Sequence, residues 1–278
     1  MQATVLSISG SDPTGGAGIQ ADLKTMTSIG VYGAAAITCI TVQSSHGVVS
    51  INCLPPDQVR QQIKVVMDDH RVTHVKIGMV GTMAIAEAIH DALSDFKGEI
   101  IYDPVMISST GQPLREGIEV NEFPVLLVSQ CTVLTPNIPE LSHLSKVQIE
   151  HHHEALHHAE QLLSKYNRLR AILVKGGHAI RNAAIVDTMV YRTENDIRTM
   201  SISHSSVKTQ NTHGTGCTLA SAFASFHCLC GDDIQSFQQS VDYVQTVLRN
   251  SAPMRIIRNP EGLGGMLHFS FRSENRTC

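Results

Sequence analysis

Apolar runs alternate with amphipathic stretches along almost the whole chain. This alternation is typical of βαβ units arranged around a mostly parallel sheet. Several runs are apolar throughout, as expected for strands that helices cover on both faces. The predicted strands are Thr4–Ser9, Ala34–Val42, His74–Gly78, Glu99–Asp103, Cys131–Leu134 and Ala171–Lys175. No repeat, linker or change of composition divides the chain, so a single α/β domain over residues 1–278 is the simplest interpretation.

Helical periodicity and turn residues predict further elements. A Pro-Pro pair precedes Asp57–Asp69, whose apolar residues fall on one side of a helix. Asp232 is a suitable N-cap for a second amphipathic helix. Two β-type stretches, Ala184–Tyr191 and Ile197–His204, are separated by a short polar turn. They predict a small hairpin near the edge of the sheet.

Composition and charge narrow the function classes. Hydrophobic residues make up 42% of the chain and charged residues 17%, which fits a well-buried globular enzyme. The formal net charge of -4 argues against bulk nucleic-acid binding. The longest apolar stretch, around Val31–Val42, is too short to span a bilayer, and the N-terminus lacks a basic leader. We therefore expect a soluble, cytoplasmic protein without a membrane partner, whose seven cysteines are reduced thiols.

The most distinctive segment is Asn211-Thr-His-Gly-Thr-Gly-Cys217, which leads directly into a run of small helix-forming residues. The backbone N–H groups of Gly214, Thr215 and Gly216 are expected at a helix N-terminus, where unpaired donors and the positive dipole end suit a phosphoryl group. Cys217 would lie in the first turn, where the dipole favours thiolate over thiol, so that it could act as a base toward a hydroxyl. The alternative is a tight turn above a buried cysteine.

Five segments in the same order resemble the hydroxymethylpyrimidine/phosphomethylpyrimidine kinase family of the ribokinase-like superfamily. They are Gly10-Ser-Asp-Pro-Thr-Gly-Gly-Ala-Gly-Ile-Gln-Ala-Asp22, Lys76-Ile-Gly-Met79, Thr135-Pro-Asn-Ile-Pro-Glu140, Val174-Lys-Gly-Gly-His178 and Gly214-Thr-Gly-Cys217. The resemblance extends over most of the chain, although the C-terminal segment departs from the usual family ending. Residues from about 270 to 278 are expected to form a mobile tail.

The resemblance implies a three-layer α/β/α sandwich with a mostly parallel central sheet and no large lid domain. It implies that ATP and Mg²⁺ are used to phosphorylate 4-amino-5-hydroxymethyl-2-methylpyrimidine and then its monophosphate, and that the protein is a homodimer. Two alternatives stay open. One is a pyridoxal kinase of the same fold, and the other is a non-catalytic pyrimidine sensor that kept the pocket.

The resemblance also implies roles for individual residues. Cys217 would be the catalytic base, beside an anion hole formed by Gly214, Thr215 and Gly216. The substrate would contact Gly10, Asp22, Gln43, Met79 and Val105. The nucleotide would contact Asn137, Lys175, Thr212 and Gly214, and Mg²⁺ would be held by Asp103 and Glu140. A carboxylate such as Glu140 in a first helical turn could equally serve only as a favourable capping charge.

Overall fold

The computed structural model describes residues 3–107, 111, 114, 123–176 and 184–270. Its centre is one nine-stranded sheet with the strand order β3-β2-β1-β4-β5-β6-β7-β8-β9. The strands are β1 (Thr4–Ser11), β2 (Tyr32–Ser44), β3 (Gly47–Cys53), β4 (Val72–Ile77), β5 (Glu99–Tyr102), β6 (Val133–Leu134), β7 (Ala171–Val174), β8 (Ile185–Arg192) and β9 (Ile197–His204). Strands β2, β1, β4, β5, β6 and β7 are parallel to one another. Strand β3 pairs antiparallel at one edge of the sheet, and β8 and β9 pair antiparallel at the other.

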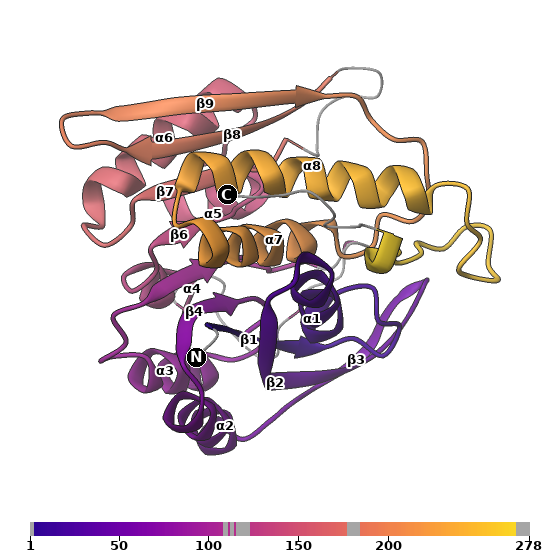
Figure 1. Cartoon of the computed structure of the whole chain (residues 1–278), viewed down its shortest axis with the longest axis horizontal. Coiled ribbons are helices and arrows are strands. Elements are labelled where there is room, and N and C mark those ends of the chain that lie inside the picture. The colour runs from indigo at the N-terminus through magenta and orange to yellow at the C-terminus, as the bar shows by residue number, and fades with distance from the viewer. Residues whose placement is uncertain (1–2, 108–110, 112–113, 115–122, 177–183, 271–278) are drawn as a thin grey trace.

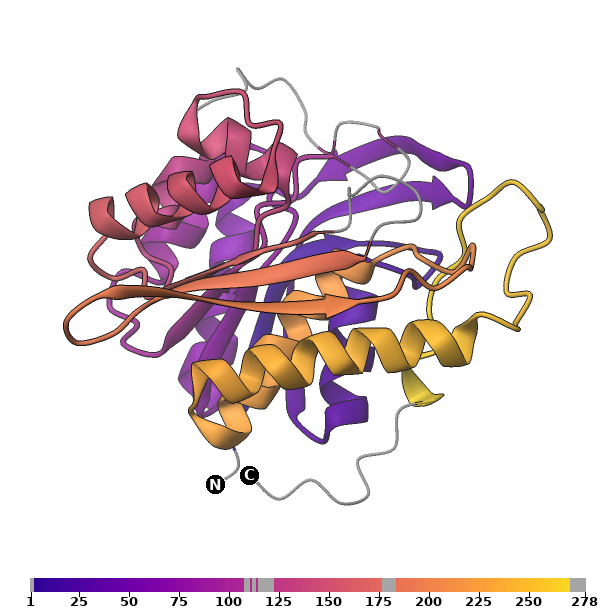
Figure 2. The same ribbon diagram turned by 90° about the horizontal axis from the view of Figure 1, so that it is seen from above.

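Helices cover both faces of the sheet, which gives the predicted three-layer α/β/α sandwich (Figures 1 and 2). The helices are α1 (Gly18–Ile29), α2 (Pro56–Asp69), α3 (Met83–Ala92), α4 (Phe123–Val128), α5 (Ile138–Ser145), α6 (His152–Lys165), α7 (Thr215–Cys230), α8 (Asp233–Ser251) and the 3-10 turn η1 (His268–Ser270). Helices α1, α7 and α8 pack on one face, and α2 to α6 pack on the other. In the described part of the chain, no helix is long and apolar enough to cross a membrane.

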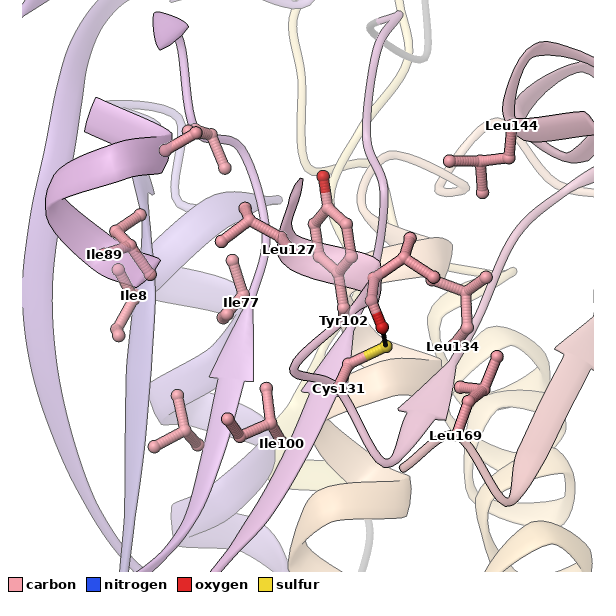
Figure 3. Close-up of a cluster of buried hydrophobic side chains, with 14 of the residues drawn as sticks. Ile8, Ile77, Ile89, Ile100, Tyr102, Leu127, Cys131, Leu134, Leu144 and Leu169 are labelled. Atoms are coloured by element: carbon pink, nitrogen blue, oxygen red, sulfur yellow. Dashed lines mark hydrogen bonds between the residues drawn. The ribbon is translucent and has the colours of Figure 1, made fainter. Parts of the chain in front are cut away.

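The central strands are apolar throughout because successive side chains enter two different cores. On β5, Ile100 and Tyr102 join the core under α2 to α6, while Ile101 between them joins the core under α1, α7 and α8. Figure 3 shows Ile100 and Tyr102 beside Ile77 of β4 and Leu127 of α4. All of these side chains are at most 1% exposed, and burial of each contributes roughly 1.5–3 kcal/mol.

The predicted strands and the edge hairpin are confirmed to within a few residues, but β3 was missed. The chain leaves β2 at Ser44 and returns as Gly47–Cys53, so that the β2–β3 hairpin forms the edge opposite β8–β9 (Figure 1). Strand β3 has only one neighbour and several exposed residues, and its mixture of valines with serine and asparagine gives a weak apolar pattern. The predicted tail falls almost entirely on residues 271–278, outside the described residues.

A directed chain of hydrogen bonds lies near the amino ends of the central strands. Arg170 Nη2 donates to His227 Nε2 at 3.0 Å, and since arginine only donates, this nitrogen is the acceptor. The proton of His227 is then on Nδ1, which donates to His74 Nε2 at 2.9 Å. By the same logic, His74 donates from Nδ1 to Thr73 Oγ1, also at 2.9 Å. Both histidines are therefore held in the neutral form.

Acid should destabilise the protein through His74. Burial and the neighbouring His227 lower the pKa of His74 from 6.5 to about 4. Between these values the unfolded chain binds a proton that the native imidazole does not, so stability falls as the pH falls through this window. The free energy of unfolding, measured with urea at about pH 7 and about pH 4.5, should fall less in His74→Gln than in the wild type. The difference between the two decreases should be about 2 kcal/mol. The control is His153→Gln on the exposed side of α6, and an equal loss in His74→Gln and wild type would contradict the assignment.

Candidate active site

A cavity of about 900 Å³ lies beyond the carboxyl ends of the parallel strands. This is the usual ligand position in open α/β sheets, because the loops that follow the strands converge there. The cavity collects thirteen of the fourteen residues that the sequence singled out. They are Gly10, Gln43, Met79, Asp103, Val105, Asn137, Glu140, Lys175, Thr212, Gly214, Thr215, Gly216 and Cys217.

Helix α7 begins at this cavity, directly after Gly214. Gly214 has φ of +84°, and a Cβ at this position would lie 1.8 Å from the carbonyl oxygen of Gly16, so no other residue fits without a backbone shift. A Cβ on Gly216 would lie 3.3 Å from Lys175 Nζ and 3.7 Å from Asp103 Oδ2. The positive end of the helix dipole and the Lys175 ammonium therefore meet at one place, which suits an anion.

Lys175 holds two carboxylates at the cavity wall. Its Nζ lies 2.7 Å from Asp103 Oδ1 and 3.4 Å from Glu140 Oε2. Burial by itself lowers the pKa of Lys175, but the charges of Asp103 and Glu140 outweigh burial and raise the pKa. Asp103 Oδ1 also accepts from Thr135, whereas the buried Oδ2 has no hydrogen-bond partner among the residues that the structure describes.

The unsatisfied Oδ2 of Asp103 fits a divalent cation. An unpaired buried carboxylate oxygen is costly, and a hard cation would satisfy it. Magnesium usually takes only one or two protein carboxylates and keeps several waters, so Asp103 and the nearby Glu140 are sufficient. Among the described residues, no group of three or more His, Cys, Asp or Glu side chains could hold a metal ion.

Glu140 also caps helix α5. Its Oε2 accepts from the backbone N–H of Asn137 at 2.8 Å, and the Asn137 side chain accepts from the backbone N–H of Glu140 at 2.8 Å. This reciprocal pair is a capping box. Burial raises the pKa of Glu140, while Lys175 opposes the shift. Glu140 therefore caps helix α5 and also lines the cavity.

Cys217 lies in the first turn of α7 and is half-buried. Its sulfur accepts a hydrogen bond from the backbone of Gly18. Burial nevertheless raises the pKa of the Cys217 thiol to about 11, although Lys76 lowers it, and Asp22 and Asp103 raise it further. Burial thus works against the thiolate that the first helical turn was expected to favour, because desolvation of the charged sulfur outweighs the attraction of Lys76.

Asp22 is the one predicted residue that does not line the cavity. It is completely buried on α1, where both carboxylate oxygens bind Lys76 Nζ at 2.9 and 3.0 Å. Ser7 and Ser221 each donate to it at 2.6 Å. The expectation that Asp22 faces the substrate pocket is corrected on this ground, since its oxygens are used by partners behind the cavity wall.

The sequence did not single out Asp12 and His213, although both line the cavity. His213 Nε2 lies 2.8 Å from Asp12 Oδ2 and 3.1 Å from Gln43 Nε2, so the three side chains form one network. Asp12 also accepts from the backbone of Thr14 and Ala17. Burial raises the pKa of Asp12, but hydrogen bonds from His213 and Thr14 outweigh it and lower the pKa to about 2. Asp12 could have been found from the sequence, because it follows the first strand and precedes the turn residues Pro13-Thr-Gly.

Solved structures share the whole architecture. The match to the ADP complex of pyridoxal kinase from Bacillus subtilis covers 97% of this chain and 98% of that chain, with a TM-score of 0.82. At 24% sequence identity, this match shows that the fold is shared. The crystal structure of phosphomethylpyrimidine kinase from Clostridium difficile matches 88% of this chain and 98% of its own, with a TM-score of 0.73 at 32% identity. The three-layer fold, with its ligand cavity at the strand ends, is that of the ribokinase-like kinases.

Sequence comparison identifies the branch within this class. The profile of the phosphomethylpyrimidine kinase family matches residues 12–260. The chain is 34% identical over 269 residues to the hydroxymethylpyrimidine/phosphomethylpyrimidine kinase of Bacillus subtilis, and the match covers 96% of this chain and 95% of that protein. The chain belongs to the phosphomethylpyrimidine kinase family.

Proposed function

We propose that this kinase transfers the γ-phosphate of ATP to the hydroxymethyl group of 4-amino-5-hydroxymethyl-2-methylpyrimidine and then phosphorylates the resulting monophosphate. The relatives that it matches over nearly their full length carry the name of both activities. The observation that carries the proposal is that the α7 N-terminus and Lys175 meet Asp103 in one cavity with Gln43, and that Asp103 Oδ2 has no hydrogen-bond partner in the described part of the chain. Phosphoryl transfer depends mainly on such positioning and charge stabilisation.

The pyrimidine end of the proposed site is built around Gln43. A carboxamide offers both a donor and an acceptor, which complements the edge of an aminopyrimidine ring. Contacts with Thr41 and His213 restrict its side chain. Met79 and Val105 supply apolar walls, and the backbone at Gly10 closes the same side of the cavity.

At the phosphate end, we assign the nucleotide to Asn137, Lys175, Thr212 and Gly214, which all line the cavity. Gly214, Thr215 and Gly216 form the proposed anion hole at the start of α7. Asp103 and Glu140 would hold Mg²⁺, which neutralises charge on the phosphates when bound. The contacts of Lys175 Nζ with both carboxylates and its closeness to Gly216 support this assignment.

Cys217 is the proposed base for the first step. It would take the proton of the substrate hydroxyl while the oxygen attacks phosphorus and ADP leaves. Lys76, buried behind it, is the positive charge that favours the thiolate. The homodimer and the cytoplasmic location stay predictions that rest on the family resemblance and on sequence composition.

A coupled ADP-release assay tests the proposed function. With Mg·ATP, both the hydroxymethylpyrimidine and its monophosphate should turn over well above pyridoxal. Preference for pyridoxal would overturn the substrate assignment while leaving the fold and site intact. Pyrimidine binding without any turnover would instead favour the sensor.

The two phosphorylation steps should differ in their dependence on Cys217. The pKa of the thiol is about 11, so below it the thiolate fraction rises about tenfold per pH unit. The first-step kcat/KM should therefore rise between about pH 7 and pH 9, whereas a phosphate acceptor, with its second pKa of about 6, is already ionised. Cys217→Ala should abolish this slope and lower the first step about 10²-fold or more.

Cys228→Ala, in the last turn of the same helix, is the matched control and should leave both steps unchanged. Equal loss of both steps in Cys217→Ala, or an unchanged pH slope, would show that Cys217 has an architectural role rather than that of a base.

Glu140→Gln should separate capping from metal binding. Glutamine is also accepted in a capping box, so the free energy of unfolding should change by less than about 1 kcal/mol. Loss of the charge should raise the Mg²⁺ concentration for half-maximal rate roughly tenfold. Titration of the rate with Mg²⁺ and urea unfolding measure the two effects. An unchanged Mg²⁺ requirement together with lower stability would leave Glu140 with the capping role alone.

A further inference from the structure

The β2–β3 hairpin places two cysteines directly opposite each other. Cys39 of β2 pairs in register with Cys53 of β3. The backbone N–H of Leu54 donates to the carbonyl of Thr38 at 2.9 Å, which makes Cys39 and Cys53 a non-hydrogen-bonded pair of the antiparallel ladder. Residues in such pairs have Cα atoms about 4.5 Å apart, within the range that a disulfide requires.

The side chains of this pair point at each other. Their sulfur atoms lie 2.9 Å apart, and no disulfide joins them. A disulfide bond of about 2.05 Å would need the sulfurs to close by only about 0.9 Å, which small side-chain rotations supply. The register of the two strands and the closeness of the two sulfurs are therefore compatible with a cross-strand disulfide.

Gly81, in the loop between β4 and α3, leaves room for the two sulfurs because it has no Cβ. It has φ of +93°, and a Cβ there would lie 2.2 Å from Cys39 Sγ and 2.7 Å from Cys53 Sγ. Cys39 is completely buried, whereas Cys53 on the edge strand is partly exposed. An oxidant in solution thus reaches Cys53, and Cys39 is positioned to react second.

The other close pair of cysteines has no such geometry. Cys228 and Cys230 are two residues apart on α7, and side chains at this spacing do not face each other on a helix. Each sulfur has a different hydroxyl neighbour, Thr73 at 3.7 Å and Ser236 at 3.4 Å. This pair serves as an internal control.

We propose that Cys39 and Cys53 are a redox modification site that forms a cross-strand disulfide with a small-molecule disulfide as oxidant. The Cys53 thiolate attacks the oxidant RSSR, which gives a mixed disulfide and releases one thiolate RS⁻. The Cys39 thiolate then attacks Cys53 Sγ, and the second RS⁻ leaves. In sum, two protein thiols and RSSR give one protein disulfide and two RSH. This inference is independent of the proposed kinase activity.

The disulfide would join the edge strand β3 covalently to β2, which leads to the cavity. Thr41 and Gln43, two and four residues beyond Cys39 on the same strand, line the cavity. The bond would close a loop between positions separated by 14 residues. Constraining the unfolded chain in this way should raise the Tm by roughly 5 °C.

The test uses the full folded chain equilibrated with glutathione disulfide and reduced glutathione at a series of ratios, then alkylated and digested with trypsin. Both cysteines lie on the tryptic peptide 25–60, and peptide 209–249 carries Cys217, Cys228 and Cys230. Peptide 25–60 should lose the mass of two hydrogen atoms and resist alkylation, while peptide 209–249 forms no internal disulfide. Reductant should reverse the mass change and the rise in Tm.

Two variants test the order of attack. Cys39→Ser should trap glutathione on Cys53, whereas Cys53→Ser should acquire no adduct on peptide 25–60 and show no rise in Tm. Full alkylation of peptide 25–60 in the wild-type protein at every ratio would overturn the proposal. So would a glutathione adduct on wild-type Cys53 that Cys39 never displaces. Because the wild-type measurement decides the main point, the proposal does not depend on either variant folding.

Discussion

The buried ion pair of Lys76 and Asp22 is the interaction on which the site depends. Neither side chain has any exposed surface, and Ser7 and Ser221 complete the bonding of the carboxylate. The four residues come from β4, α1, β1 and α7, so one polar cluster joins two central strands to two helices. Removing one partner of such a buried pair typically costs about 3–5 kcal/mol, because the other charge is left uncompensated. The same ammonium lowers the pKa of Cys217, so the cluster connects the core with the proposed chemistry.

Charge balance explains how the cavity can accommodate phosphates. Lys175 pairs with both Asp103 and Glu140 at the wall and offsets part of their negative charge, and the N-terminus of α7 contributes a partial positive charge. A phosphate bound with a divalent cation brings both signs of charge. The phosphate can then pair with Lys175 while the cation pairs with the carboxylates, so that no ion is left unpaired. This agrees with the proposed use of Mg·ATP.

Most of the fold and the start of α7 could be predicted because they depend on local sequence. Apolar runs on both sides of Ile101 require two covered faces, and the glycines around Thr215 require a helix that starts abruptly. Gln43 and Lys175 were expected in one site from the family resemblance, and the parallel strands bring them together because their carboxyl ends lie at one edge of the sheet. Strand β3 escaped prediction because an edge strand with one partner needs little apolar sequence.

The sequence by itself determined the order of strands and helices and the glycines at the start of α7, since periodicity and backbone conformation are properties of neighbouring residues. The other predicted residues of the cavity came from the resemblance of their segments to the kinase family. Only the tertiary structure decided three things: that Asp22 turns away from the cavity toward Lys76, that burial raises the pKa of the Cys217 thiol, and that Cys39 faces Cys53. Each depends on distant segments that come together on folding. Desolvation, ion pairing and cross-strand register act through such contacts, and none of them is encoded in the residues adjacent along the chain.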